Sequence, residues 1–246
     1  MATTKKTKKK TSTPKTSLYS VDLKELLEAG VHFGHQARRW NPKMGEFIYT
    51  KREGVHIFDL GLTAKKLAEA MSFVRDLVSS GKEIVLIGTK RQATAIIKEE
   101  AVKVGAPYVA VRWLGGMITN WQQLKKSIDK LNDMEAKKEK GDYKKYTKRE
   151  NVMIDKDIAR LNHFLSGLRG LKEPPAAIFV VDVKKEEPAV KEAMLKEVVV
   201  VAMVDTNSDP NMADYIIPAN DDAVSSIKLI VSKIGKAYAD GKAARH

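Results

Sequence analysis

The sequence predicts an α/β protein with a doubly wound, mostly parallel β-sheet and an inserted antiparallel coiled-coil helical hairpin. Two observations carry this prediction. Apolar, β-branched segments alternate with amphipathic helical segments over most of the chain, which is the order expected when helices cover both faces of a parallel sheet. Residues 119–168 break the alternation, because their apolar residues recur at helical spacing and no segment there has the pattern of a strand.

The first half of the chain begins the alternation of helix and strand. Residues 21–30 have apolar residues at helical spacing and end on Gly30, which places the following HFGH sequence (32–35) in a loop. Residues 47–60 predict two short strands joined at Arg52-Glu53-Gly54. Four further elements are predicted in order: a helix over 62–81, a strand over 83–89, a helix over 91–105 and a strand over 108–111.

The alternation resumes after the insertion. The continuous runs of Val and Ile in this half are typical of strands buried on both faces of a parallel sheet. The sequence therefore predicts one core domain made of residues 18–118 and 169–246. The predicted strands are 176–183, 198–206 and 215–219, and the predicted helices are 187–196 and 221–240.

The insertion, residues 119–168, contains two helical seams on either side of a charged turn with Gly141-Asp142. Such a pattern predicts two antiparallel helices, each reaching roughly 30 Å. The alternative is that both helices lie flat on the sheet, but their charged surfaces favour a protruding arm that binds a partner. The seams are Trp121, Leu124, Ile128, Leu131 and Met134, then Ile154, Ile158, Leu161, Leu165 and Leu168.

The composition narrows the class of function. The chain has 44 Lys and Arg residues against 31 Asp and Glu, a net charge of +13. A protein this basic usually binds a polyanion, most often nucleic acid and less often an anionic membrane surface. The absence of cysteine excludes disulfides and thiol nucleophiles and suits a reducing cytoplasm. No apolar run approaches the ~18 residues of a membrane span.

Residues 1–17 are predicted to form a disordered basic tail, because they are rich in Lys and Thr and lack an acidic residue. The tail lacks the apolar stretch of a signal peptide, and a transit peptide is disfavoured because arginine is missing. Two uses remain open, loose contact with phosphates and a purely solubilising role.

Two motifs bring arginine and tryptophan together, RRWNPK (38–43) and VRWLGGMITNW (111–121). Guanidinium groups pair with phosphates, and rings or guanidinium planes stack on unpaired bases, so this combination favours RNA. For Trp113 and Trp121 we favour the alternative that they brace the foot of the hairpin. The residues expected to face RNA are Arg38, Arg39, Trp40, Lys43, Lys90, Arg91, Arg112 and Asn120.

The GTKR sequence (88–91) lies between a predicted strand and a predicted helix. A helix N-terminus with two cations favours an anion site. The alternative is that Thr89 caps the helix while the two cations are solvated. A Walker A loop and a GxGxxG sequence are both absent, so the motif suits an RNA phosphate better than a nucleotide.

Several possible metal ligands fall near the carboxyl ends of predicted strands, where α/β folds build their sites. Nitrogen and carboxylate ligands of this kind suit zinc. The alternatives are that Asn220 or Asp221 caps the last helix and that Asp205 only organises its turn. A bound metal would favour a structural or partner-bridging role over hydrolysis. The candidate ligands are His32, His35, Asp205, Asp221 and Asp222.

Catalysis has little support, because HExxH, GxSxG and Cys/His arrangements are all absent. Three classes of function remain to be compared. The first is a structural protein of an RNA assembly, the second an enzyme of nucleotide or sugar-phosphate metabolism, and the third a free regulatory RNA-binding protein. A bound small anion with turnover would mark the second class, and activity away from any large RNA assembly the third.

Several long motifs occur here in one order: GVHFGHQARRWNPKM, VHIFDL, IGTKRQA, VRWLGGMITNW, FVVDV and VVVVAMVDTNSDPNMADYIIPANDDA. In this order they resemble the family of bacterial small-subunit ribosomal protein S2, from about Ser17 to about Gly241. The resemblance implies a flavodoxin-like α/β domain with an inserted coiled-coil hairpin. The tail before Ser17 departs from the short start common in bacterial members.

The resemblance also implies a function. It implies a non-enzymatic structural constituent of the cytoplasmic ribosome that contacts small-subunit ribosomal RNA and neighbouring proteins and helps to anchor ribosomal protein S1. It implies no required cofactor, no membrane and no small-molecule substrate, and it leaves a divalent metal such as zinc as an open possibility at the histidine–aspartate group.

Overall fold

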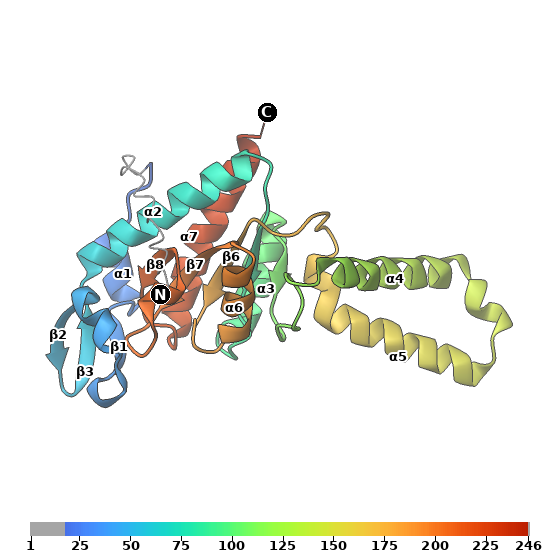
Figure 1. The fold of residues 1–246 in the computed structure, drawn as a ribbon, viewed down its shortest axis with the longest axis horizontal. Helices are drawn as coiled ribbons and strands as arrows, with labels where there is room; N and C mark the ends of the chain where they lie inside the picture. Colours follow the sequence, from blue (N-terminus) through green and yellow to red (C-terminus); the bar gives the residue numbers. More distant parts are fainter. Residues whose placement is uncertain (1–17, 246) are drawn as a thin grey trace, which may run out of the picture.

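The structure is a computed structural model and describes residues 18–245. Its centre is a five-stranded parallel sheet with the order β5-β4-β6-β7-β8 (Figure 1). Numbered within this sheet, the order is 2-1-3-4-5, the order of flavodoxin-like doubly wound sheets. The strands are β4 (Ile84–Ile87), β5 (Tyr108–Val109), β6 (Ala177–Val181), β7 (Val199–Val204) and β8 (Tyr215–Pro218).

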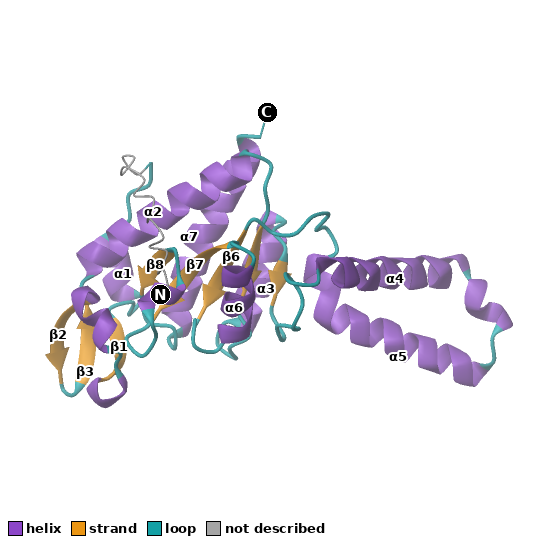
Figure 2. Ribbon diagram, in the orientation of Figure 1, coloured by secondary structure: helices purple, strands orange, loops and turns teal. Residues whose placement is uncertain are grey.

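Helices cover both faces of this sheet, because its strands are apolar on both sides (Figure 2). Alternate residues such as Leu86 and Phe179 pack with α2, α3 and α7, while Val85 and Ile178 pack on the other face with α6 and the base of the hairpin. The helices of the core are α1 (Leu23–Glu28), α2 (Leu60–Ser79), α3 (Thr94–Val104), α6 (Glu187–Leu195) and α7 (Val224–Ala243).

A separate three-stranded antiparallel sheet has the order β1-β3-β2, with β1 (Phe33–Gln36), β2 (Ile48–Arg52) and β3 (Val55–Phe58). The predicted pair of strands over 47–60 is therefore confirmed. The prediction that HFGH lies in a loop is wrong, because most of it forms β1, which pairs with β3. The chain signals this strand weakly, since its partner lies about 20 residues further on.

The insertion forms two helices, α4 (Trp121–Lys140) and α5 (Lys148–Leu165), which project side by side from the body (Figure 1). Gly141 ends α4 in the left-handed conformation that glycine adopts without strain, and Thr147 and Glu150 form a capping box at the start of α5. Near the base, Arg169 pairs with Glu135 of α4 at 2.6 Å. The alternative in which both helices lie flat on the sheet is therefore excluded.

Other predictions have mixed outcomes. The helix predicted from residue 91 begins at Thr94 and its N-cap is Ala93, so GTKR does not lie at a helix N-terminus and Thr89 is not its cap.

The predicted tail, residues 1–17, lies outside the described residues. Within residues 18–245, none of the helices combines the length and the apolar character needed to cross a membrane.

Candidate functional site

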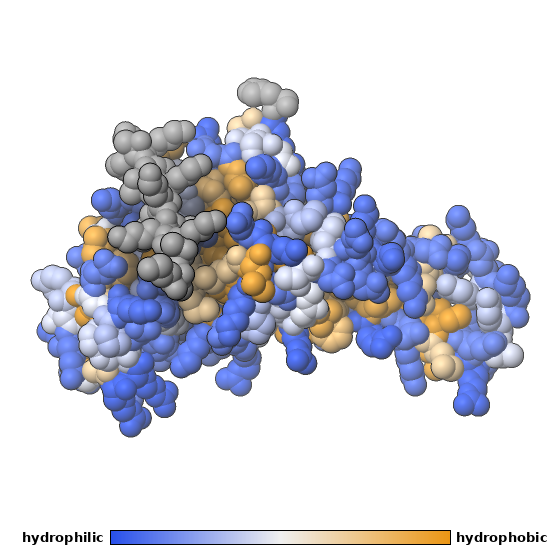
Figure 3. Space-filling view, in the orientation of Figure 1, coloured by the Kyte–Doolittle hydropathy of each residue, from blue (hydrophilic) through white to orange (hydrophobic). Residues whose placement is uncertain are grey.

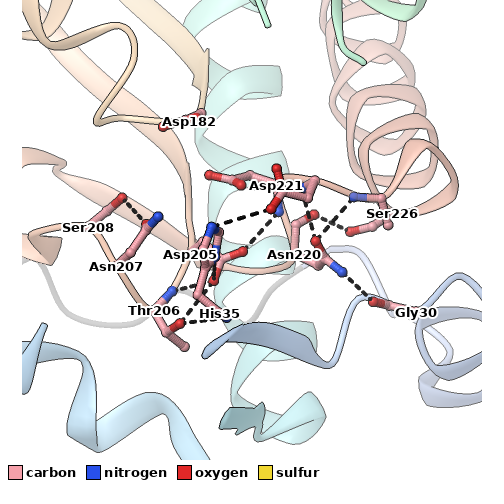
Figure 4. Close-up of polar contacts among 12 residues, drawn as sticks. Gly30, His35, Asp182, Asp205, Thr206, Asn207, Ser208, Asn220, Asp221 and Ser226 are labelled. Atoms are coloured by element: carbon pink, nitrogen blue, oxygen red, sulfur yellow. Dashed lines mark hydrogen bonds and ion pairs between the residues drawn. The ribbon is translucent and has the colours of Figure 1, made fainter. Parts of the chain in front are cut away.

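The carboxyl ends of the parallel strands gather a polar cluster (Figure 4). Lys90 follows β4, Asp182 follows β6, Asp205 follows β7 and Asp221 follows β8. Parallel strands bring their carboxyl ends to one edge, so residues far apart in the sequence meet there. His35 joins the cluster from β1 of the small sheet.

His35 bridges two carboxylates. Its Nδ1 lies 3.0 Å from Asp205 Oδ1, and its Nε2 lies 3.3 Å from Asp222 Oδ2. The hydrogen bond to Asp205 raises the pKa of His35 above its usual value, although burial opposes the shift. The arrangement favours an imidazolium that donates from both nitrogens and ties the small sheet to the main one.

Asp205 also fixes the turn after β7. Its carboxylate accepts hydrogen bonds from the backbone N–H of Thr206, at 2.5 Å, and from that of Asp221, at 3.2 Å. Asp205 therefore organises its turn, as the alternative to a metal ligand supposed, but it also pairs with His35. Asn220 accepts hydrogen bonds from the backbone N–H groups of Asp222 and Ala223, just before α7, whose N-cap is Ala223 rather than Asn220 or Asp221.

Lys90 has different partners from those its sequence motif suggests. Its Nζ lies 2.6 Å from Asp222, 2.7 Å from Asp221 and 3.2 Å from Asp182, and its side chain is only 12% exposed. Burial alone would lower its pKa, but the charge of Asp221 and the hydrogen bonds to Asp221 and Asp222 raise it. The charge of Lys90 is therefore taken up by carboxylates of the fold rather than presented to RNA.

Asp221 is the acid of the cluster whose charged form is disfavoured by its surroundings. Burial, together with the charges of Asp205 and Asp182, raises its pKa to about 7, although Lys90 opposes the shift. Its Oδ2 is buried and has no hydrogen-bond partner among residues 18–245. Asp221 thus retains an oxygen that a cation or a proton would satisfy.

The cluster fits a divalent metal in part. One ligand atom each from His35, Asp205 and Asp221 lie within 4.8 Å of one another, and nitrogen and carboxylate ligands suit zinc. The ammonium of Lys90 already supplies a cation to Asp221 and Asp222, and Asp222 faces His35 from the other side. His32 does not belong to this group, because its ring packs against Phe33 with a centroid distance of 4.0 Å.

Glu186, which is 2% exposed, lies beside the carboxyl end of β4, where it binds Thr89. Its carboxylate accepts hydrogen bonds from the backbone N–H of Thr89, at 3.0 Å, and from the Thr89 hydroxyl, at 2.5 Å. In flavodoxin-like sheets the switch point beside this strand is the usual place for a small ligand. Here a carboxylate of the chain itself takes the donors that an anion would need.

The RRWNPK loop lies beside the small sheet. The N–H of Ala37 donates to the carbonyl of Gly54 at 2.8 Å, which brings Arg38 and Arg39 next to the turn between β2 and β3. Arg38 and Arg39 are exposed, and Trp40 is 39% exposed. Lys43 is exposed but pairs with Asp209 at 2.6 Å, so part of its charge is already balanced.

The small sheet adds two cations that the sequence analysis did not select. Lys51 and Arg52 at the end of β2 are both exposed and lie across from β3. Arg52 belongs to the predicted turn Arg52-Glu53-Gly54 and Lys51 directly precedes it, which was the available signal. On the face seen in Figure 3, hydrophilic side chains cover much of this end of the molecule and of the hairpin.

The second Arg–Trp motif is held by one carboxylate. Glu192 of α6 accepts hydrogen bonds from the backbone N–H groups of Gly116, Ile118 and Thr119 at 2.7–3.2 Å, and from Trp113 Nε1 at 3.1 Å. Trp113 is buried, as expected for a brace at the hairpin foot. No sequence signal distinguishes Glu192 from Glu187, the other acid on α6.

The polar residues that flank the 111–121 loop are exposed to solvent. Arg112 and Asn120 are exposed on either side of the Glu192 contacts, and Arg91 is exposed after β4. Trp121, the first residue of α4, is partly buried against the apolar cluster below the hairpin. The predicted RNA-facing residues therefore do not form one surface. Arg38, Arg39, Trp40 and Lys43 lie by the small sheet, Arg112 and Asn120 flank the loop that leads into α4, and Lys90 and Arg91 follow β4.

Comparisons with known proteins give one consistent result. Residues 26–241 match the family model described as Ribosomal protein S2. The chain is also 48% identical over 221 residues to Small ribosomal subunit protein uS2 of Bdellovibrio bacteriovorus, an alignment covering 90% of this chain and 71% of that relative.

Proposed function

Because the chain belongs to the ribosomal protein S2 family, we propose that it is a structural constituent of the small ribosomal subunit, located on the cytoplasmic ribosome, and not an enzyme. Family membership over most of the chain is the observation that carries this proposal. The net charge of +13 supports it, since a basic protein in a ribonucleoprotein neutralises phosphates.

Two exposed groups form the proposed contacts with small-subunit ribosomal RNA. Arg38, Arg39 and Trp40 lie at the small sheet beside Lys51 and Arg52. Exposed guanidinium groups can pair bidentately with phosphates, and an exposed indole can stack on a base. The second group is Arg91, Arg112 and Asn120, with Lys43 as a weaker member of the first because Asp209 pairs with it.

Contacts with proteins belong to the same proposal. The protruding hairpin, which we take to be a coiled-coil insertion distinct from the core, offers a surface away from the sheet (Figure 1). Neighbouring small-subunit proteins, ribosomal protein S1 among them, are the proposed partners. The lysine-rich tail is proposed to add loose phosphate contacts.

The alternative function, an enzyme of nucleotide or sugar-phosphate metabolism, is disfavoured by the acidic side chains at the strand ends. An anionic substrate there would meet Asp182, Asp205 and Asp221, and like charges repel. Lys90 is already bound by carboxylates, and the N–H of Thr89 already donates to Glu186. The donors of Lys90 and Thr89 are thus already engaged by carboxylates of the fold.

The RNA surface is tested by measuring binding to small-subunit ribosomal RNA over a range of salt concentrations. Replacing Arg38 and Arg39 together by Ala should weaken binding and lower the slope of log affinity against log salt by about 1.4–1.8, for two lost phosphate contacts. The matched control replaces Lys228 and Lys236 on α7 by Ala, two exposed cations outside the proposed surface. Equal losses in both variants would contradict the proposed surface.

A divalent metal at His35, Asp205 and Asp221 is a second proposal, favoured by the unpartnered Asp221 Oδ2. It would tie the small sheet to the strand ends and shape that surface for a partner. Dialysis against dilute zinc followed by elemental analysis should find about one equivalent in the native chain and much less in Asp221→Asn. Exposed Asp142→Asn is the control, and equal zinc in all three proteins would contradict a site at Asp221.

A further inference from the structure

His56, in the middle strand of the small sheet, is a polar side chain that the fold does not satisfy. It is 8% exposed, and both Nδ1 and Nε2 are buried without a hydrogen-bond partner among residues 18–245. Buried polar groups are nearly always paired, because leaving one unpaired costs free energy. Because both of its ring nitrogens are unpaired, His56 is a candidate group for binding another molecule.

Trp40, in the RRWNPK loop, packs against this histidine with its ring tilted. The two ring centroids are 5.0 Å apart, and the ring planes are inclined by 35°. The indole is still 39% exposed, so one part of it packs on His56 while another part faces solvent. An exposed aromatic surface backed by a second ring is a suitable platform for a base.

Two basic side chains, Lys51 and Arg39, lie close to Trp40 and His56 in the chain or in the small sheet. Lys51 of β2 pairs in register with His56 of β3, which puts the two side chains on one face of the small sheet. Arg39 precedes Trp40 in the chain and is exposed. Burial and the charge of Lys51 lower the pKa of His56, so the ring is neutral and offers one donor and one acceptor. A nucleobase edge carries the matching acceptor and donor.

We propose that Trp40, His56 and Lys51 form a site for one unpaired RNA nucleotide. The base stacks on Trp40, the indole shifts so that the base edge reaches the nitrogens of His56, and Lys51 contacts the adjoining phosphate. The proposal rests on the proposed function as an RNA-binding ribosomal protein and adds the kind of RNA feature bound. A paired base cannot enter, because both its faces and its edge are occupied in the duplex.

The test compares two RNA probes with the full chain. One is a short oligoadenylate, and the other is a fully paired RNA duplex with the same number of phosphates, both labelled for fluorescence anisotropy. Trp40→Ala should weaken oligoadenylate binding by roughly 5- to 150-fold, the cost of losing one stacked base, and leave duplex binding nearly unchanged. Trp40→Phe keeps a ring and should retain most of the preference.

His56→Phe separates hydrogen bonding from packing. The ring remains under Trp40, but the nitrogens are gone, so oligoadenylate binding should fall by roughly 2- to 10-fold with duplex binding unchanged. Oligoadenylate should also quench a part of the tryptophan emission that is missing in Trp40→Phe. This readout depends on the base meeting the indole and does not respond to charge alone.

The outcomes separate this inference from the function on which it rests. If the chain binds both probes equally and neither Trp40→Ala nor His56→Phe changes that, the nucleotide site is refuted and RNA binding stands. If it binds neither probe nor small-subunit ribosomal RNA, both proposals fall. Selective loss of oligoadenylate binding in Trp40→Ala and His56→Phe supports the site.

Discussion

At the scale of single residues, the ion pairs of each basic side chain decide whether it is available to bind RNA. Lys90 and Arg91 are neighbours in the sequence, yet three carboxylates hold Lys90 while Arg91 is exposed. A lysine in a basic motif is therefore available to RNA only when no acid of the fold reaches it. Lys43 lies between these cases, because it is exposed and pairs with Asp209.

His56→Phe should stabilise the free protein. Phenylalanine keeps a ring under Trp40 and removes two buried nitrogens without partners, so the free energy of unfolding should rise by about 1 kcal/mol or more. Urea denaturation measures this. Exposed His163→Phe on α5 is the matched control and should give no gain, and a loss of stability in His56→Phe would show that the nitrogens are satisfied in solution.

The same substitution predicts a pH dependence. Burial lowers the pKa of His56 in the folded chain below its ordinary value of 6.5. The unfolded chain therefore binds a proton more readily, and the native protein loses stability as the pH falls below 6.5. His56→Phe lacks this loss, so its advantage in unfolding free energy should be larger at pH 5 than at pH 8.

At the residue scale, the sequence predicted which side chains lie close together. It did not predict which of them form ion pairs and hydrogen bonds with one another. His35, Asp205, Asp221 and Asp222 lie together, because strand ends of a parallel sheet share one edge. His32 is outside the group, and the role of Lys90 depends on acids from two other strand ends, which no local pattern reveals.

At the scale of elements, Glu192 ties α6 to the loop that leads into the hairpin. Its carboxylate is the shared acceptor for several backbone N–H groups of residues 116–119. Carboxylates bound this way hold a loop in one shape, because hydrogen bonds to a charged acceptor are stronger than those between neutral groups. The direction in which α4 leaves the core therefore depends on a residue of a different helix.

Glu192→Gln should destabilise the protein by about 1–3 kcal/mol at neutral pH, since an amide would turn a donor toward backbone donors. Burial alone would raise the pKa of Glu192, but the hydrogen bonds from Gly116, Thr119 and Trp113 lower it below 4.5. This stabilisation is present above pH 4.5 and is lost as the pH falls through the lowered pKa.

The gap in unfolding free energy between the native chain and Glu192→Gln should therefore narrow in acid, as measured by urea denaturation at several pH values. Glu187→Gln is the control, because Glu187 is on the same helix and exposed. Equal effects at both positions would show that the loop does not depend on Glu192.

Gly167 gives a second test of the junction between hairpin and sheet. A Cβ at this position would overlap the carbonyl oxygen of Tyr108, in β5, whereas a Cβ at Gly170 would meet nothing within 4 Å. Gly167→Ala should cost about 1–3 kcal/mol of unfolding free energy through overpacking. Gly170→Ala should be nearly neutral, and a thermal or urea unfolding series that ranks the two variants the other way would contradict the tight junction.

Among the elements, those with strong periodicity were predicted and those that depend on distant partners were not. The helix α2, the strand β6 and both hairpin helices follow from their apolar spacing alone. The strand β1 was missed because it is short and is defined by pairing with β3. The start of α3 was misplaced because Thr89 and Lys90 bind Glu186 and the strand-end acids instead of opening a helix.

At the scale of the whole molecule, the small sheet and the hairpin lie at opposite ends of an elongated body (Figure 1). The proposed RNA contacts at the small sheet are therefore far from any partner that the hairpin reaches. A rigid core between two binding surfaces suits a protein that joins separate parts of an assembly. The alternation of strands and helices predicted this core, but the direction of the arm depends on contacts such as those of Glu192.

The central claim is that the chain is a constituent of the small ribosomal subunit. Sedimentation of a cell lysate through a sucrose gradient at moderate magnesium, with immunodetection of the chain, tests it most directly. A constituent of the small subunit should co-migrate with small subunits and whole ribosomes at about one copy in each. A chain found only in a free, low-mass peak would contradict it.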